Sequence, residues 1–239
     1  MTERLSSKKR EEIEASYRAI TERIAEAKAK AGRTDEIRLM AVTKTVAPEA
    51  VNLAVSLGVR LLGENRVQEF LEKRDEYVPE AEIHFIGGLQ TNKVKYIIDK
   101  VAMIHSVDNE RLLREIDRRA GESGLIKDVL FEVNIGGEES KNGVPPDRLG
   151  ALTEAATACP NVRVRGLMTI PPIDRDGSSE RYFERMERLF TDLKSESRGE
   201  DGFPIDTLSM GMSGDFETAI RYGSTIVRIG SLLFGYRKY

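Results

Sequence analysis

Eight short apolar runs, each followed by a longer segment with charged residues at intervals, are the feature that most constrains the fold of this chain. A strand that is covered on both faces of a parallel sheet is apolar along its whole length, so the runs predict buried strands. The segments between them place apolar residues three or four apart, which predicts helices. The predicted strands cover residues 39–42, 60–63, 83–87, 103–107, 128–135, 162–169, 205–210 and 225–230.

Alternating strands and helices indicate an α/β protein, either a doubly wound open sheet or a closed (β/α)8 barrel. Eight repeats of about 25 residues favour the barrel, the TIM barrel, in a chain of 239 residues. No linker, low-complexity stretch or internal repeat divides the chain, so we expect one domain over 1–239 with the barrel over 37–239. Residues 8–31 carry apolar side chains at steps of three and four and are followed by Gly32, which predicts a leading amphipathic helix.

Caps and prolines predict where several other helices begin and end. Pro48 suits the first turn of the helix after the first strand, because its missing N–H would have no partner there. Asp108 is expected to cap a helix that runs to about Ser123, and Pro145 to open a helix that Pro160 closes. Further helices are expected over residues 64–71, 91–100, 178–194 and 215–222.

Composition argues against several classes of function. The net charge is −3 and basic residues are interleaved with acidic ones, as at 8–12, so we expect no nucleic-acid partner. Two histidines and one cysteine, without the spacing of metal ligands, argue against a metal site. The single cysteine, Cys159, can form no internal disulfide and is expected to be a small buried side chain. The N-terminus carries no apolar secretion segment and no run reaches the ~18 apolar residues that a membrane span needs. We therefore expect a cytoplasmic protein with no membrane partner.

Lys44 follows the first predicted strand and precedes the helix that Pro48 opens. Partial desolvation in that place favours the neutral amine, which is the form that condenses with an aldehyde to give a Schiff base. The alternative is an ordinary lysine whose stem packs against the barrel while its head reaches solvent.

The loops after the seventh and eighth predicted strands predict an anion site. The first loop, residues 209–214, contains two serines, Ser209 and Ser213, and two glycines, and Gly230 and Ser231 follow the eighth strand. In a barrel these two loops commonly bind phosphate, because exposed N–H groups favour an anion. The alternative is that Ser213 only caps the following helix. A lysine that can form a Schiff base, combined with a phosphate site, matches pyridoxal phosphate, which carries an aldehyde at one end and a phosphate at the other.

Arg228 lies in the eighth predicted strand, two residues before Gly230. An arginine is always charged and accepts no proton, so a ring nitrogen that faces it stays unprotonated and the ring is a poor electron sink. The alternative is a salt bridge inside the barrel.

The carboxyl ends of barrel strands carry the reactive residues, so these positions are expected to surround one mouth. No nucleophile elbow and no P-loop occurs in the sequence, which argues against a hydrolase or a nucleoside triphosphatase. The mouth positions are Lys44, Glu64, Asn65, 84–88, Ser106, Asn134, Met168, 209–214 and 228–231.

Six segments of the sequence resemble the signature blocks of the pyridoxal phosphate homeostasis proteins, which are themselves similar to the barrel domain of alanine racemase. The resemblance extends over nearly the whole chain and keeps the order of the blocks. It implies that Lys44 holds pyridoxal phosphate covalently, that Ser213, Gly230 and Ser231 bind its phosphate, and that Arg228 faces its ring nitrogen. It also implies that the pocket is lined by Asn65, His84, Met168 and Ser209. The blocks are residues 42–46, 63–69, 84–93, 166–168, 208–213 and 227–231.

Two functions remain open at this point. One is a carrier or regulator that holds pyridoxal phosphate reversibly, is not an enzyme, acts as a monomer and passes the cofactor to apo-enzymes. The other is an enzyme that acts on an amino acid through the bound cofactor, such as a racemase. Racemisation needs bases on two faces of the cofactor, and the resemblance implies that alanine racemase takes its second base from a further domain. Here the eight repeats are expected to occupy the chain, with residues 234–239 as a tail, so we expect no racemase activity. A barrel for another phosphorylated metabolite is a third option, but it would leave Lys44 without a role.

Overall fold

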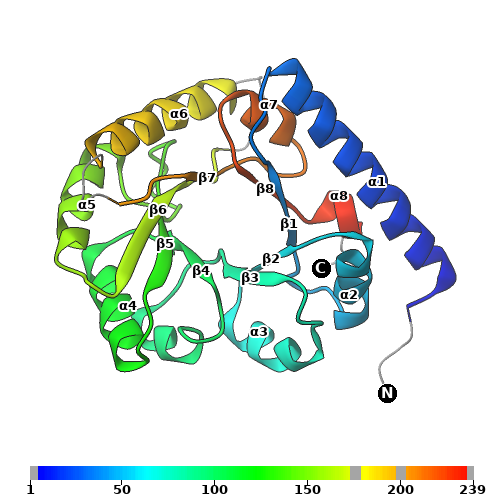
Figure 1. Cartoon of the computed structure of the whole chain (residues 1–239), viewed down its shortest axis with the longest axis horizontal. Coiled ribbons are helices and arrows are strands. Elements are labelled where there is room, and N and C mark those ends of the chain that lie inside the picture. Colours follow the sequence, from blue (N-terminus) through cyan, green and yellow to red (C-terminus); the bar gives the residue numbers. More distant parts are fainter. Residues whose placement is uncertain (1–4, 173–178, 198–202, 236–239) are drawn as a thin grey trace.

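A computed structural model describes residues 5–172, 179–197 and 203–235 of the chain. Eight parallel strands form a closed barrel in sequence order, from β1 next to β2 around to β8 next to β1. Figure 1 shows the strands as a central ring with the helices around it. The predicted (β/α)8 barrel is therefore confirmed. The strands are β1 (Arg38–Val42), β2 (Leu61–Glu64), β3 (Glu82–Phe85), β4 (Met103–Val107), β5 (Lys127–Glu132), β6 (Val162–Met168), β7 (Thr207–Ser209) and β8 (Ile226–Ile229).

The helices follow the strands in the expected alternation. Pro48 is the first residue of α2, as its missing N–H predicts. The α-helices are α1 (Ser7–Lys30), α2 (Pro48–Leu57), α3 (Val67–Lys73), α4 (Glu110–Glu122), α5 (Leu149–Thr157), α6 (Ser179–Glu196), α7 (Phe216–Arg221) and α8 (Ser231–Phe234). Three short 3-10 helices are η1 (Arg74–Glu76), η2 (Thr91–Tyr96) and η3 (Pro146–Arg148).

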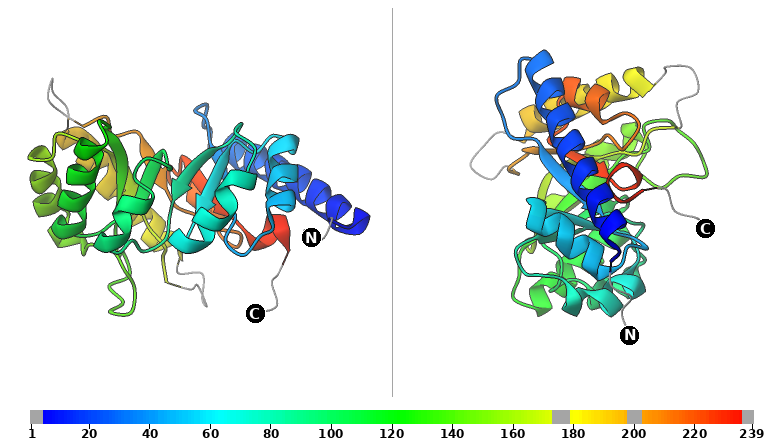
Figure 2. Two further views of the ribbon diagram at one scale, coloured as in Figure 1. Left: turned by 90° about the horizontal axis from the view of Figure 1, so that it is seen from below. Right: turned by 90° about the vertical axis from the view of Figure 1, so that its right-hand side faces the viewer.

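The leading helix α1 lies outside the barrel and packs against α2, α7 and α8 (Figures 1 and 2). Ser6 caps it through its side chain, which accepts the backbone N–H of Lys9. Its buried face consists of Ile13, Ile20, Ile24 and Ala27. The predicted amphipathic helix is thus confirmed, and it covers the place where β8 meets β1 and the barrel closes.

The apolar core has two parts, one outside the ring of strands and one inside it. The outer layer packs helices against the outward faces of the strands and contains most of the buried leucine, isoleucine and valine side chains. Inside the barrel, two smaller apolar clusters contain Met40, Leu61 and Ile226, and Met103, Leu130 and Met168. Polar side chains from β3, β4, β7 and β8 are buried as well: His84, His105, Ser209 and Arg228.

Several predicted boundaries are wrong by a residue or more. Asn109, not Asp108, caps α4, because its side chain accepts the N–H of Leu112 at 2.9 Å. The segment expected as a helix over 91–100 is a 3-10 helix that ends at Tyr96, and α8 was not expected at all. Cys159 is buried as predicted, and burial raises the pKa of its thiol.

Some predictions cannot be compared in full, because they include residues outside the described ranges. These are the start of the expected helix 178–194, the end of the expected tail 234–239, and those stretches of the expected single domain 1–239 that are not described. Of the helices in the described ranges, none is both long enough and apolar enough to cross a membrane.

Candidate functional site

The carboxyl ends of the strands bring the predicted site residues to one mouth of the barrel. Lys44 lies in the turn after β1, Asn65 follows β2, and Ser213 lies in the loop after β7. The remaining predicted residues at this mouth are Met168 at the end of β6, Ser209 at the end of β7, Arg228 in β8, and Gly230 and Ser231 after β8.

Lys44 is half-buried in a tight turn between β1 and α2. The turn is closed by a hydrogen bond from the N–H of Val46 to the carbonyl of Thr43, at 3.0 Å. Among the described residues, no hydrogen bond or ion pair engages the Nζ atom of Lys44. The amine is therefore available to a ligand at the mouth.

Two carboxylates hold the turn on either side of Lys44. The hydroxyl of Thr43 donates to Glu64 Oε1 at 2.7 Å, and the hydroxyl of Tyr77 donates to the same oxygen at 2.6 Å. Burial raises the pKa of Glu64, whose second carboxyl oxygen is buried without a hydrogen-bond partner in the described part of the chain. On the other side, the N–H of Thr45 donates to the carboxylate of Glu69. Glu64 was expected at the mouth, and its contacts identify it as a support for the turn.

Thr45 has a φ angle of +57°, the one positive φ of a residue other than glycine in the described ranges. A β-branched residue is rarely found in this left-handed region, because its side chain crowds the backbone there. The hydrogen bond to Glu69 helps to keep Thr45 in this conformation. The backbone next to Lys44 is thus held in a strained geometry.

The loop after β7 and the start of α8 are linked by Ser213. Its Oγ atom accepts the N–H of Leu232 at 3.3 Å. The helix α7 begins at Phe216 after Asp215, so Ser213 does not cap it and that alternative is wrong. The N–H groups of Ser213 and Gly214 donate to no other group in the described part of the chain, which leaves them free to bind an anion.

Gly211 allows this loop to turn close to α7. Its φ angle is +90°, and a Cβ atom there would lie 2.6 Å from Cβ of Ala219 and 3.0 Å from Cα of Phe216. A side chain at this position would therefore push the loop away from the helix. The carbonyl of Gly211 accepts the N–H of Arg228 at 2.9 Å, which fixes the loop to β8.

Arg228 is buried, with 3% of its surface exposed, and its guanidinium hydrogen-bonds only to neutral oxygens among the described residues. Nη1 donates to the carbonyl and to the hydroxyl of Ser209, both at 2.8 Å, and Nη2 donates to the carbonyl of Thr169 at 2.8 Å. No carboxylate of the described residues forms an ion pair with it, so the predicted alternative of a salt bridge is wrong. Burial lowers the pKa of Arg228 to about 10, which leaves the group charged at neutral pH.

His84 lies in β3, with its side chain inside the barrel. It is completely buried in β3, and both ring nitrogens are engaged, Nδ1 with His105 at 2.8 Å and Nε2 with Glu82 at 2.5 Å. Two residues near the site were missed in the sequence: His105, and Glu132 at the end of β5. Burial raises the pKa of Glu132 to about 7. In both strands every second side chain points into the barrel, and His105 and Glu132 occupy such positions. The sequence can therefore indicate that these side chains point inward, but it does not show which groups they contact.

Asn65 lines a rim cavity of about 460 Å³ between α3 and the loop after β3. The loop passes so close that a Cβ atom on Gly87 would lie 2.1 Å from the carbonyl oxygen of Asn65. Glycine is therefore required at position 87, and the close approach fixes Asn65 at the edge of the mouth.

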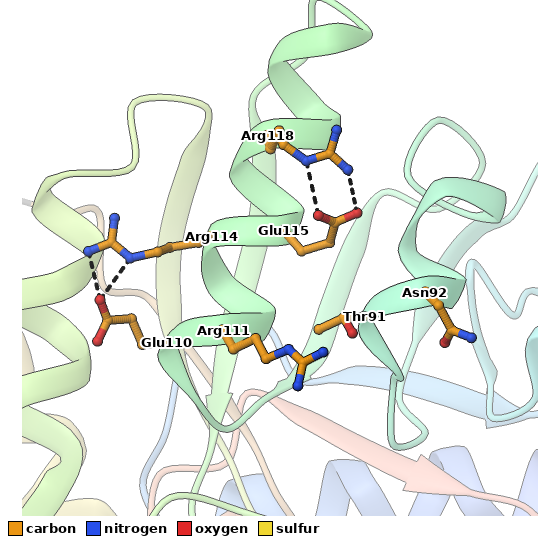
Figure 3. A pocket seen from close by; sticks show the side chains of 7 residues that line it. All are labelled: Thr91, Asn92, Glu110, Arg111, Arg114, Glu115 and Arg118. Atoms are coloured by element: carbon orange, nitrogen blue, oxygen red, sulfur yellow. Dashed lines mark hydrogen bonds and ion pairs between the residues drawn. The ribbon is translucent and has the colours of Figure 1, made fainter.

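A second groove, of about 680 Å³, lies between η2 and α4 (Figure 3). Four of its five charged side chains form two ion pairs, Glu110 with Arg114 at 2.6 Å and Glu115 with Arg118 at 2.7 Å (Figure 3). None of the predicted site residues lines this groove, so we place the functional site at the mouth instead.

Comparisons with known proteins identify the family of the chain. The family model described as the N-terminal domain of alanine racemase matches residues 16–238. A pyridoxal phosphate homeostasis protein from Aquifex aeolicus is 48% identical over 223 residues, which are 92% of this chain and 96% of that protein. The chain is a member of the pyridoxal phosphate homeostasis protein family.

Solved structures extend the comparison to three dimensions. A protein from Bifidobacterium adolescentis is 34% identical, with a TM-score of 0.90, over 97% of this chain and 98% of that one. PipY of Synechococcus elongatus, solved with PLP bound, is 32% identical, with a TM-score of 0.77, over 89% of this chain and 100% of PipY. Alanine racemase from Streptomyces lavendulae, at 20% identity and a TM-score of 0.71, shares the fold of this family member; the match covers 96% of this chain and 58% of the racemase.

Proposed function

We propose that this chain is a carrier of pyridoxal phosphate that holds the cofactor reversibly in the cytoplasm and passes it to apo-enzymes. In this proposal Lys44 holds the cofactor covalently and Arg228 faces its ring nitrogen. Ser213, Gly230 and Ser231 bind the phosphate, and Asn65, Met168 and Ser209 line the pocket. His84 supports the site from below. The protein acts as a single domain and as a monomer, without a metal.

The observation that carries the proposal is that Lys44 follows β1 and Arg228 lies in β8, the neighbouring strand, at the same mouth. Met40 of β1 is in register with Arg228 of β8, and Lys44 follows in the turn after β1. One residue offers an amine without a partner in the described part of the chain, and the other a buried cation held by neutral oxygens. The free N–H groups of the loop after β7 add a place for an anion.

This set of donors fits the groups of the cofactor. When bound, pyridoxal phosphate supplies an aldehyde that condenses with an amine, with the release of one water molecule. Lys44 Nζ provides that amine, and the N–H groups of Ser213 and Gly214 provide donors for a phosphate. The guanidinium of Arg228 has no acceptor atom and keeps its charge, so it can only donate a hydrogen bond to a ring nitrogen.

Arg228 also favours a carrier over a racemase. Proton removal from an amino acid needs a ring that withdraws electrons, and a ring nitrogen that accepts a hydrogen bond from arginine remains unprotonated. The relatives that are named as homeostasis proteins also support a carrier over a racemase, and the match to one of them extends over 96% of that protein.

The covalent attachment can be tested by reduction with borohydride and mapping of the modified peptide by mass spectrometry. We expect pyridoxal phosphate to be fixed to Lys44, and Lys44→Ala to lose both the adduct and the yellow colour while the barrel stays folded by circular dichroism. Lys93→Ala is the matched control, since Lys93 lies on the rim and its Nζ donates to Gln68 at 2.8 Å. An adduct of undiminished yield in Lys44→Ala would refute the assignment.

A further inference from the structure

A continuous line of five polar side chains runs through the interior of the barrel from the mouth to the opposite end. Arg228 Nη1 donates to Ser209 Oγ at 2.8 Å, and Ser209 Oγ lies 3.2 Å from His105 Nδ1. His105 Nε2 lies 2.8 Å from His84 Nδ1, and His84 Nε2 lies 2.5 Å from Glu82 Oε1. Ser209 belongs to β7 and His105 to β4, which are not neighbours in the sheet, so this link crosses the barrel.

The carboxylate of Glu82 sets the direction of the hydrogen bonds along the line. It only accepts, so the neutral ring of His84 carries its proton on Nε2, donates to Glu82 and accepts at Nδ1. His105 therefore carries its proton on Nε2 and donates to His84, and its Nδ1 accepts from the hydroxyl of Ser209. At the other end Arg228 has donors and no acceptor, so Ser209 Oγ also accepts from Arg228.

The charge states of the groups agree with this direction. The bond from His84, together with the guanidinium of Arg38 at 2.9 Å, lowers the pKa of Glu82 to about 2, so the carboxylate is ionised. Burial lowers the pKa of His84, and lowers that of His105 further, so both rings are neutral at neutral pH. The charged groups that act on the pair are Glu82, Arg38, Asp128 and Arg228.

We propose that His105 and His84 are positioning residues, which hold Arg228 against the ring nitrogen of the cofactor through Ser209 and connect it to the negative charge of Glu82. This inference rests on the proposed function for the place of the cofactor. A buried guanidinium without an ion pair among the described residues needs negative charge density on its acceptors. A carboxylate that polarises two imidazoles and a hydroxyl in series supplies it, because hydrogen bonds in a chain strengthen one another.

The direction of the line can be tested without the cofactor. The chain has two histidines, so nitrogen-15 labelling of histidine gives NMR spectra that single variants assign directly. We expect both rings to carry their proton on Nε2 and neither to titrate between pH 6 and pH 8. A proton on Nδ1 of either ring, or a titration near pH 6.5, would overturn the proposal.

The positioning of Arg228 can be tested with the cofactor bound. Pyridoxal phosphate labelled with nitrogen-15 in its ring reports the environment of the ring nitrogen directly. We expect Ser209→Ala to shift that resonance and to raise the dissociation constant roughly two- to tenfold, and Ser209→Thr to restore both. Glu82→Gln, which removes the negative charge at the far end of the line and also the ion pair with Arg38, should shift the resonance as well.

Asp206→Asn is the matched control for Glu82→Gln. Asp206 immediately precedes β7, pairs with Arg165 of β6 and accepts the hydroxyl of Thr207, but it is not part of the line. We expect this variant to leave the ring resonance unchanged. Glu82→Gln and Ser209→Ala spectra that both coincide with the wild type would contradict the proposal, whereas failure of the wild type to bind the cofactor would contradict the proposed function instead.

Discussion

Thr45 connects backbone strain to the position of Lys44. A residue other than glycine in the left-handed region costs on the order of 1 to 3 kcal/mol, and such residues persist where their surroundings hold them. Here the N–H of Thr45 bonds to Glu69, while Thr43 on the other side of Lys44 bonds to Glu64. The strained backbone at Thr45 is therefore part of a turn that holds Lys44 in one orientation.

We predict that Thr45→Gly increases the free energy of unfolding by about 1 kcal/mol, because glycine adopts this φ without crowding, and that it weakens cofactor binding, because the turn becomes more flexible. Chemical denaturation and titration with pyridoxal phosphate measure the two effects. Ala47→Gly is the control, since Ala47 has an ordinary φ of −66° and glycine there relieves no strain. Equal losses of stability in both variants would show that Thr45 carries no strain.

At the scale of single residues, the sequence was informative where a residue type is tied to one chemistry. Lys44, Arg228 and Ser213 are predicted site residues because of their places after or within predicted strands, and their role in binding stays a prediction. The structure removes the salt-bridge alternative for Arg228 and the helix-cap alternative for Ser213. The partnership of His105 with His84 could not be predicted, because it depends on which inward side chains meet across the barrel.

Among the elements, the loops after β7 and β8 are tied together by Ser213 and by the bond from Arg228 to Gly211. Because the two loops act as one unit, a change in one is expected to disturb the anion site in both. The loop after β7 is thus more than a connection between a strand and a helix.

We predict that Ser213→Ala weakens cofactor binding by about 1.5 to 3 kcal/mol if its hydroxyl donates to the phosphate, the range for a hydrogen bond to a charged group. Pyridoxal, which lacks the phosphate, should lose more. Competition titrations of wild type and variant with both compounds measure these differences. Pyridoxal that competes as well as its phosphate would place the anion site elsewhere.

Element boundaries were predictable where one residue determines them and not where packing decides. Pro48 determined the start of α2, whereas the choice of Asn109 over Asp108 as the cap of α4 depends on local geometry that neighbouring side chains fix. The helix α8 has four residues, too few for a periodic signal, and was missed for that reason.

For the whole molecule, the count of eight strand and helix repeats was enough to predict a closed barrel over an open sheet. Closure itself is long-range: β1 pairs with β8, with Met40 opposite Arg228, and no local pattern in either strand specifies that pairing. It also sets the distance between the residues proposed to hold the two ends of the cofactor. The fold was therefore predictable from repetition, while the contacts inside the barrel required the structure.

The central claim is a carrier that does not act on amino acids, and one comparison of two samples of the cofactor-loaded protein tests it most directly. One sample is mixed with each amino acid in deuterium oxide, and NMR follows exchange of the Cα hydrogen. The other is mixed with a cofactor-free enzyme that requires pyridoxal phosphate, whose regained activity reports transfer of the cofactor. The account predicts transfer of the cofactor and no exchange with any amino acid. Rapid exchange with one amino acid would contradict it.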